Sequence, residues 1–211
     1  MVRRDAPYKN RTHIKLRIAK DFPNMFLSKP FFDVIDQVEG TLESPDNVYE
    51  RHLSAMADMY EDQAAAQAAL DGGDPVIYKV YERKLPELAG ELQWCMSVTL
   101  PGKIGREYYM TKGHFHQVRE TAEIYLCVRG QGYMLMENEK GESEAIKMKP
   151  NAAVYVPASW AHRSVNTGDE PLISFCVYPG DAGHDYGSIE TDGFKKRIVE
   201  IDGKPQIIDN A

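Results

Sequence analysis

The chain has 211 residues and a formal net charge of -7. Its length suits one domain with a substantial core, or a domain with an added arm, and its 43% of hydrophobic residues argues against a disordered chain. An acidic chain repels polyanions at long range, which argues against a nucleic-acid binder but does not exclude a small anionic substrate.

The cysteines and the N-terminus indicate the compartment. Cys95, Cys127 and Cys176 each lie in an apolar stretch, and no two are close in sequence. Buried free thiols in a reducing compartment are the plain interpretation. The chain begins without the apolar run of a signal peptide, and no stretch approaches the roughly 20 apolar residues of a membrane span. We therefore expect a cytoplasmic protein without membrane segments.

Residues 1–74 are weakly patterned, and Pro23, Pro30 and Pro45 break them into short pieces. Residues 62–70 are rich in Ala and Gln and are followed by two glycines, which predicts a short helix that ends there. We expect residues 1–74 to form an N-terminal arm with this helix packed on the domain that follows.

Residues 75–211 have the pattern of a β domain. Residues 76–82 largely alternate apolar and polar side chains, as a half-buried strand does. Further strands are predicted at residues 92–100, 107–110, 122–128, 133–137, 152–156, 173–178 and 197–201. Many short strands separated by turns indicate an antiparallel sandwich or barrel. No long helix alternates with them, which disfavours a parallel α/β sheet.

Four residues in this region have the chemistry of a metal site. His114 and His116 are two apart, which on a strand places both imidazoles on one face. Glu123 begins the next apolar strand, and His162 lies on a later hairpin after a Pro-containing turn. Each has a simpler explanation, such as a surface pair, an edge carboxylate or a histidine bonding a turn. Together, three imidazoles and a carboxylate suit a divalent transition metal and leave coordination positions free for catalysis.

This arrangement resembles the two motifs of the cupin superfamily, an all-β double-stranded β-helix, or jelly-roll, barrel. The first motif corresponds to residues 113–116 with Glu123 and Gly130, and the second to residues 157–162 with Asn166. Glu120 is nearer than Glu123 to the usual spacing after the second histidine. We prefer Glu123, because six residues separate it from Gly130 as the motif requires, whereas Glu120 lies in a polar run. 

Two further departures concern turns. Ser159 replaces the glycine of the second motif. Asn151 stands where a turn glycine is usual, and asparagine tolerates positive φ better than most residues. Neither departure argues against the fold.

A closer resemblance is to the archaeal-type glucose-6-phosphate isomerase family, over about residues 74–194. It includes a run absent from the generic cupin motifs, Asp-Ala-Gly-His-Asp-Tyr-Gly at residues 181–187. Other matching stretches are residues 101–107, 111–116, 122–125, 154–157, 160–163, 165–166, 168–171 and 178–180.

The resemblance implies an isomerase of glycolysis and gluconeogenesis that interconverts glucose 6-phosphate and fructose 6-phosphate as a homodimer. It implies one divalent metal per subunit, with Fe²⁺ first and Mn²⁺, Ni²⁺ or Zn²⁺ as alternatives. The metal ligands it implies are His114, His116, Glu123 and His162. Ser97 (in place of a threonine), Thr111, Gly113 and Tyr178 fall where the family surrounds the sugar phosphate, and Tyr125 and His184 fall where it lines the sugar cavity.

We expect the catalytic residues to be Glu123, His184 and Tyr178. Our hypothesis is an enediol route with Glu123 as the base and His184 as the alternative base or ring-opening acid; a hydride shift is the other route. Lys112 and Arg163 flank the ligands and should point away from the metal.

Another metal-dependent cupin enzyme, either a dioxygenase or a different sugar isomerase, is the first alternative function. A non-catalytic sugar-binding cupin is the second.

Overall fold

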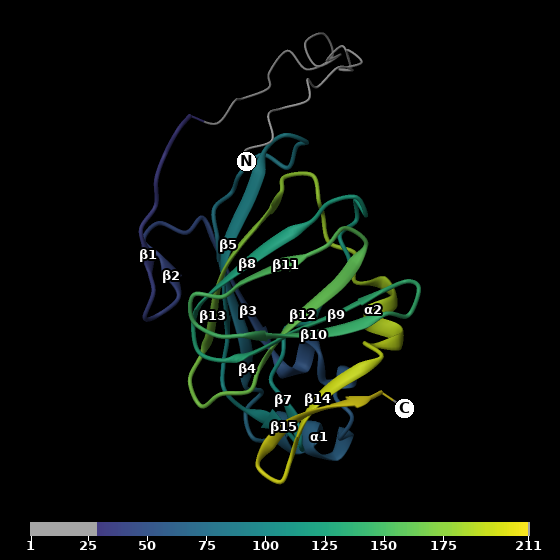
Figure 1. Ribbon diagram of the computed structural model, residues 1–211. Helices are drawn as coiled ribbons and strands as arrows, with labels where there is room; N and C mark the ends of the chain where they lie inside the picture. The colour runs from purple at the N-terminus through teal and green to yellow at the C-terminus, as the bar shows by residue number, and fades with distance from the viewer. Residues whose placement is uncertain (1–28, 211) are drawn as a thin grey trace, which may run out of the picture. The chain divides into compact units, whose positions relative to one another are not determined.

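The computed structural model describes residues 29–210 (Figure 1). Residues 1–28 of the predicted arm and Ala211 lie outside this part of the chain. The strands are β1 (Ile35–Asp36), β2 (Thr41–Leu42), β3 (Asn47–His52), β4 (Val76–Glu82), β5 (Leu92–Thr99), β6 (Lys103–Ile104), β7 (Glu107–Tyr108), β8 (Glu123–Arg129), β9 (Gly132–Asn138), β10 (Ser143–Met148), β11 (Ala153–Val156), β12 (Trp160–Asn166), β13 (Leu172–Pro179), β14 (Lys196–Ile201) and β15 (Lys204–Asp209). The helices are η1 (Leu53–Ala55), η2 (Ala57–Met59), α1 (Gln63–Asp71) and α2 (Gly187–Asp192).

Two antiparallel sheets form the centre of the fold. The larger has the order β11-β8-β13-β5-β4-β3, and the smaller has the order β10-β9-β12. Along the chain from β8 to β13, the strands cross between the two sheets, as in a jelly roll. This confirms the predicted all-β cupin class. Smaller sheets, β15-β14-β7-β6 and β1-β2, complete the architecture.

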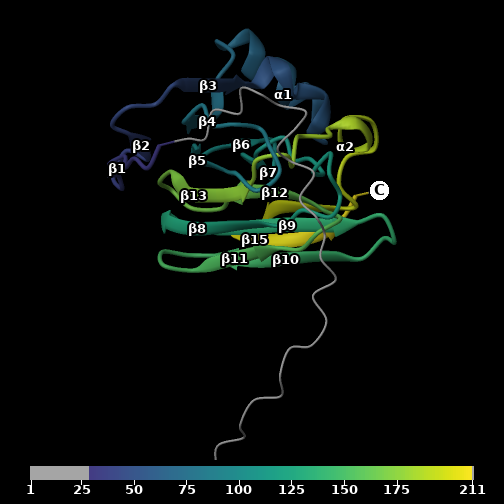
Figure 2. The ribbon, with the colours of Figure 1, turned by 90° about the horizontal axis from the view of Figure 1, so that it is seen from above.

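Helix α1 begins where the sequence predicts. The Asp62 side chain caps it by accepting a hydrogen bond from the Ala65 amide at 2.9 Å. Ala66 is buried on the helix and belongs to an apolar cluster with Leu53, Tyr60 and Ile77. In Figure 2, α1 and β3 lie on one side of the molecule and β10 and β11 on the other.

All eight predicted strands are present, with small differences at their ends. The elements that were not predicted are β1, β2, β3, β6, β10, β12, β15, α2 and the short helices η1 and η2. The division of the chain at residue 74 stays a prediction. However, β3 on its N-terminal side pairs with β4 on the other side, with Tyr49 opposite Val80.

A second apolar cluster fills the space between the sheets beside the histidines. It contains Cys127, Met134, Met136, Met148, Val154, Val156 and Leu172. No helix in the described part of the chain combines the length and apolar character that crossing a membrane requires.

Candidate metal centre

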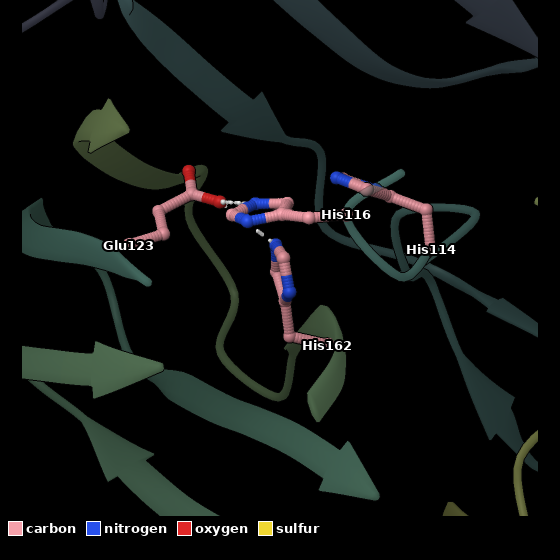
Figure 3. A group of neighbouring side chains, drawn as sticks. All are labelled: His114, His116, Glu123 and His162. Carbon is pink, nitrogen blue, oxygen red and sulfur yellow. Dashed lines mark hydrogen bonds and ion pairs between the residues drawn. The ribbon is translucent and has the colours of Figure 1, made fainter. Parts of the chain in front are cut away.

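The four predicted ligands lie together. One ligand atom from each of His114, His116, Glu123 and His162 lies within 4.8 Å of the others. Glu123 Oε2 is 3.1 Å from His116 Nε2 and 3.0 Å from His162 Nε2, as the dashed lines in Figure 3 mark. Since Glu123 begins β8 in the larger sheet and His162 lies on β12 in the smaller one, the two sheets meet at this point.

The segment that carries His114 and His116 is not a regular strand. It forms single bridges instead, from His114 to His162 and from Phe115 to Asp185. Two hydrogen bonds make the second bridge: the Phe115 amide donates to the Asp185 carbonyl at 3.0 Å, and the Asp185 amide donates back at 2.8 Å. The extended backbone still places both imidazoles on the side of Glu123, as their spacing predicts.

Polar atoms without protein partners indicate that this cluster is built for a cation. His114 Nε2 and both ring nitrogens of His162 are buried without a hydrogen bond. The 3.0 Å contact of His162 Nε2 with Glu123 lacks the alignment of a hydrogen bond. Buried polar groups normally have partners, so unsatisfied imidazoles facing one carboxylate fit a divalent metal.

His116 has the outer contact typical of a metal-binding histidine. Its Nδ1 lies 2.8 Å from Thr121 Oγ1, which leaves Nε2 directed at the centre. Glu120, the alternative carboxylate, is exposed in the turn before Thr121 and does not belong to the cluster. The preference for Glu123 on spacing is therefore consistent with the geometry.

The charges at the centre are arranged for metal binding at neutral pH. Burial alone would raise the pKa of Glu123, but the imidazoles of His162 and His116 outweigh it and lower that pKa to about 2. Burial and then the nearby His162 and His184 rings hold the pKa of His114 well below its ordinary value. The metal-free centre therefore combines an ionised carboxylate with a neutral His114.

The centre opens into a cavity of about 720 Å³. His114, Glu123 and His162 line it, together with all six residues that the family resemblance assigns to the substrate: Ser97, Thr111, Gly113, Tyr125, Tyr178 and His184. The centroid of the His184 ring lies 4.5 Å from that of the His114 ring. His184 also stacks on Tyr186, with ring centroids 6.1 Å apart. Burial lowers the pKa of His184 and raises that of Tyr178.

Gly113 shows why a glycine precedes the first ligand. Its φ is +78°, and an added Cβ would lie 2.7 Å from the Phe194 ring and 2.9 Å from Arg163 Cβ. Any side chain here would displace the backbone that orients His114.

Arg163 and Lys112 contact groups outside the four-residue cluster, and neither is simply solvated. The Arg163 guanidinium is buried 4.5 Å from the centre of the Phe194 ring, and burial lowers its pKa to about 10. Lys112 pairs with Glu190.

Sequence reasoning missed Arg51 on β3. It lines the cavity and is the only lysine or arginine among the cavity's described lining residues. No ion pair joins it to a carboxylate within residues 29–210. No motif marks it, because it lies in the weakly patterned part of the sequence.

Comparison with known proteins places this geometry in a family. The profile of the family described as "Glucose-6-phosphate isomerase (GPI)" matches residues 50–210. The chain belongs to the glucose-6-phosphate isomerase family. The match begins within β3, at residue 50, so Arg51 lies within the part that family members share.

Individual family members cover most of the chain. The glucose-6-phosphate isomerase of Pyrococcus horikoshii is 43% identical over 83% of this chain and 93% of its own length. That of Thermococcus kodakarensis is 47% identical over 76% of this chain and 84% of its own length. The one from the bacterium Sinorhizobium medicae is 36% identical over 88% of each chain.

Among solved structures, the oxalate decarboxylase of Lactobacillus farciminis is 18% identical, with a TM-score of 0.40, over 52% of this chain and 30% of that one. So limited a likeness carries no argument about chemistry.

Proposed function

We propose that this chain is a metal-dependent aldose–ketose isomerase that interconverts glucose 6-phosphate and fructose 6-phosphate. The observation that carries the proposal is the three-histidine, one-carboxylate centre at the wall of a cavity lined by all six expected substrate residues. A volume of about 720 Å³ is ample for a sugar phosphate.

The proposed ligands are His114, His116, Glu123 and His162, with one Fe²⁺ per subunit. This donor set also accepts Mn²⁺, Ni²⁺ and Zn²⁺, so reconstitution with each ion identifies the one that supports turnover. A divalent ion held here would stabilise negative charge on the two reacting sugar oxygens as a Lewis acid.

The phosphate is proposed to bind on the side of the cavity nearest Arg51. Glu82, Glu87 and Asp181 also line the cavity and would repel a phosphate, whereas Arg51 is a cation with no carboxylate partner among residues 29–210. The hydroxyl of Thr111 already accepts a hydrogen bond from the Ser164 amide at 3.0 Å, which fixes its position at the cavity wall.

Proton transfer is proposed to involve His184. The low pKa of Glu123 makes its carboxylate a weak base, and its Oε2 already faces two imidazoles. A lowered pKa keeps His184 neutral at pH 7, so that its imidazole can accept a proton. Turnover in deuterated water separates the two routes: solvent deuterium in the product supports the enediol, and none supports the hydride shift.

A coupled assay of fructose 6-phosphate conversion tests the function directly. Metal-stripped protein should be inactive and regain activity with Fe²⁺ or Mn²⁺, while His162→Ala should bind metal poorly and stay inactive. Arg129→Gln is a control variant outside the cavity, because Arg129 is a half-buried residue of β8 that pairs with Glu170. Metal binding without isomerisation would contradict the proposal.

A metal-dependent dioxygenase on the same barrel is the alternative enzyme. Turnover that requires O₂ and leaves both sugar phosphates unchanged would favour it.

We also propose a cytoplasmic homodimer. The outer face of β8 and β11 exposes Ile124, Leu126 and Tyr155, with Tyr155 opposite Ile124 in the sheet. A contiguous apolar face of this kind suits a second copy of the chain. A reducing compartment would keep the three free thiols reduced.

A further inference from the structure

Two of the three cysteines lie opposite each other in the larger sheet. Cys95 on β5 is the direct register partner of Cys176 on β13. Both are free thiols. Cys127 lies elsewhere, in the apolar cluster between the sheets.

Both side chains of the pair face the substrate cavity and line it. Their neighbours Trp94 and Phe175 pack against each other on the opposite face of the sheet, with ring centroids 5.6 Å apart. Cys176 is also the register partner of Tyr125 on β8. The two thiols therefore lie in a row of cavity side chains that includes one expected substrate residue.

The register sets the spacing of the pair. The Gly180 amide donates to the Glu91 carbonyl at 2.8 Å, one step beyond the Pro179–Leu92 pair. In an antiparallel ladder every second opposed pair is hydrogen-bonded, and the Cys95–Cys176 pair lies an even number of positions from Gly180–Glu91. Cys95 and Cys176 are therefore a hydrogen-bonded pair, with a Cα separation of about 5.5 Å. That distance lies within the roughly 4.4–6.8 Å that a disulfide spans.

We propose that Cys95 and Cys176 form an intramolecular disulfide when a peroxide enters the cavity, and that this disulfide suppresses turnover. The second half rests on the proposed isomerase function. The reaction has two steps. The Cys95 thiol reacts with H₂O₂ to give a sulfenic acid and water; the Cys176 sulfur then displaces the hydroxyl group, which leaves as a second water molecule.

The order of the steps follows from exposure. Cys95 is 8% exposed and Cys176 is 1% exposed, so the peroxide meets Cys95 first. Burial, and then the adjacent Cys95 thiol, raises the pKa of Cys176, which makes it the slower nucleophile toward peroxide. The disulfide buries no charge, and it removes a thiol that is costly to ionise there.

The bond would alter the site through its neighbours. Ser97 and Tyr178 lie two residues beyond Cys95 and Cys176 on the same face. Opposed Cβ atoms are about 4.5–5.5 Å apart in a sheet and about 3.8 Å apart across a disulfide, so the two strands must move together at this point.

Thiol accessibility after oxidation is the first test, because it does not depend on isomerase activity. Zinc-loaded protein, whose metal is not redox-active, is treated with H₂O₂, denatured, alkylated and weighed intact. We expect one alkylated thiol, at Cys127, and a proteolytic peptide in which Cys95 and Cys176 are linked. Cys127→Ser should still lose both remaining thiols, whereas Cys95→Ser should form no intramolecular disulfide. Three alkylated thiols, or a bond that includes Cys127, would overturn the proposal.

The effect on turnover is the second test. Each protein is compared with its own untreated sample: the parent chain should lose activity severalfold and recover it with dithiothreitol, while Cys95→Ser and Cys176→Ser should not respond. An equal, reductant-insensitive loss in Cys95→Ser would assign the effect to the metal and refute the regulatory half. Absence of activity in untreated protein would count against the isomerase proposal and leave the thiol result to stand alone.

Discussion

Asn151 holds a left-handed backbone conformation, with φ of +68°, in the turn before β11. Its amide donates to the Cys127 carbonyl at 2.8 Å, which ties this turn to β8. Asn151→Ala should lower the free energy of unfolding by about 1 kcal/mol, because a Cβ without a local polar group disfavours this conformation. Asn151→Gly keeps the conformation without strain and should match the parent chain. Urea denaturation measures both, and equal losses in the two variants would contradict this account.

His114 gives the metal-free protein a defined pH dependence. Its folded-state pKa is lowered, so below about pH 6.5 the unfolded chain binds a proton that the folded chain resists. Stability should therefore fall with acidification, by at most about 1.4 kcal/mol per pH unit for this group. Thermal unfolding at pH 7.5 and 5.5 measures it, and His114→Asn should show the shallower slope. An unchanged slope in the variant would assign the effect to other groups.

At the residue scale, sequence spacing predicted the composition of the cluster but not its surroundings. Glu123 was preferred to Glu120 because of its spacing from Gly130. A longer turn between His116 and Glu123 does not change that spacing. Arg51 was beyond prediction, since its place in the cavity depends on β3 pairing with β4 across a long insertion.

Among the elements, the segment from Gly180 to Tyr186 brings His184 to the cavity. Arg119 holds it by an ion pair to Asp185 at 2.6 Å, and the guanidinium lies 4.5 Å from the centre of the Phe115 ring. Arg119 also donates to the His116 carbonyl. Arg119 therefore links the segment from Gly180 to Tyr186 to the backbone at His116 and to the Phe115 ring.

Arg119→Gln should reduce kcat/KM at most about fivefold, since a partly exposed ion pair contributes up to about 1 kcal/mol. The loss should fall mainly on kcat if Arg119 positions His184, and the metal content should stay at the parent level. Asp185→Asn should behave alike, and the double variant should cost no more than either single one. Additive losses would show that the two side chains act independently.

Strands β12 and β10 escaped prediction because both lack the apolar–polar alternation of a half-buried strand, for opposite reasons. In β12 every residue except Trp160 is buried, because one face meets the metal centre and the other packs Ala161 and Val165 into the core around Phe194. Burial on both faces removes the alternation that reveals a strand. In β10 the opposite holds, since four of its six residues are partly or fully exposed charged or small side chains, and its partner β9 provides the apolar character.

For the whole molecule, Leu126→Lys should break the proposed dimer. Leu126 is 40% exposed beside Ile124 on the outer face of β8, where a charge would be buried on association. Light scattering should then give the 23.9 kDa mass of one chain in place of twice that value. Ile146→Lys on β10 is the matched control, since Ile146 is also 40% exposed but lies on the smaller sheet. A parent chain that is already monomeric would refute the dimer proposal.

The single bridges around Phe115 have a further consequence. Of the four proposed ligands, only His114 and His116 lie outside a regular strand, and their backbone is held by isolated hydrogen bonds to His162 and Asp185. Without an ion, the amides of this segment should exchange with solvent far sooner than those of β8 and β12. Deuterium uptake across residues 114–118 should therefore fall when the metal binds, and it would measure metal occupancy without substrate or turnover.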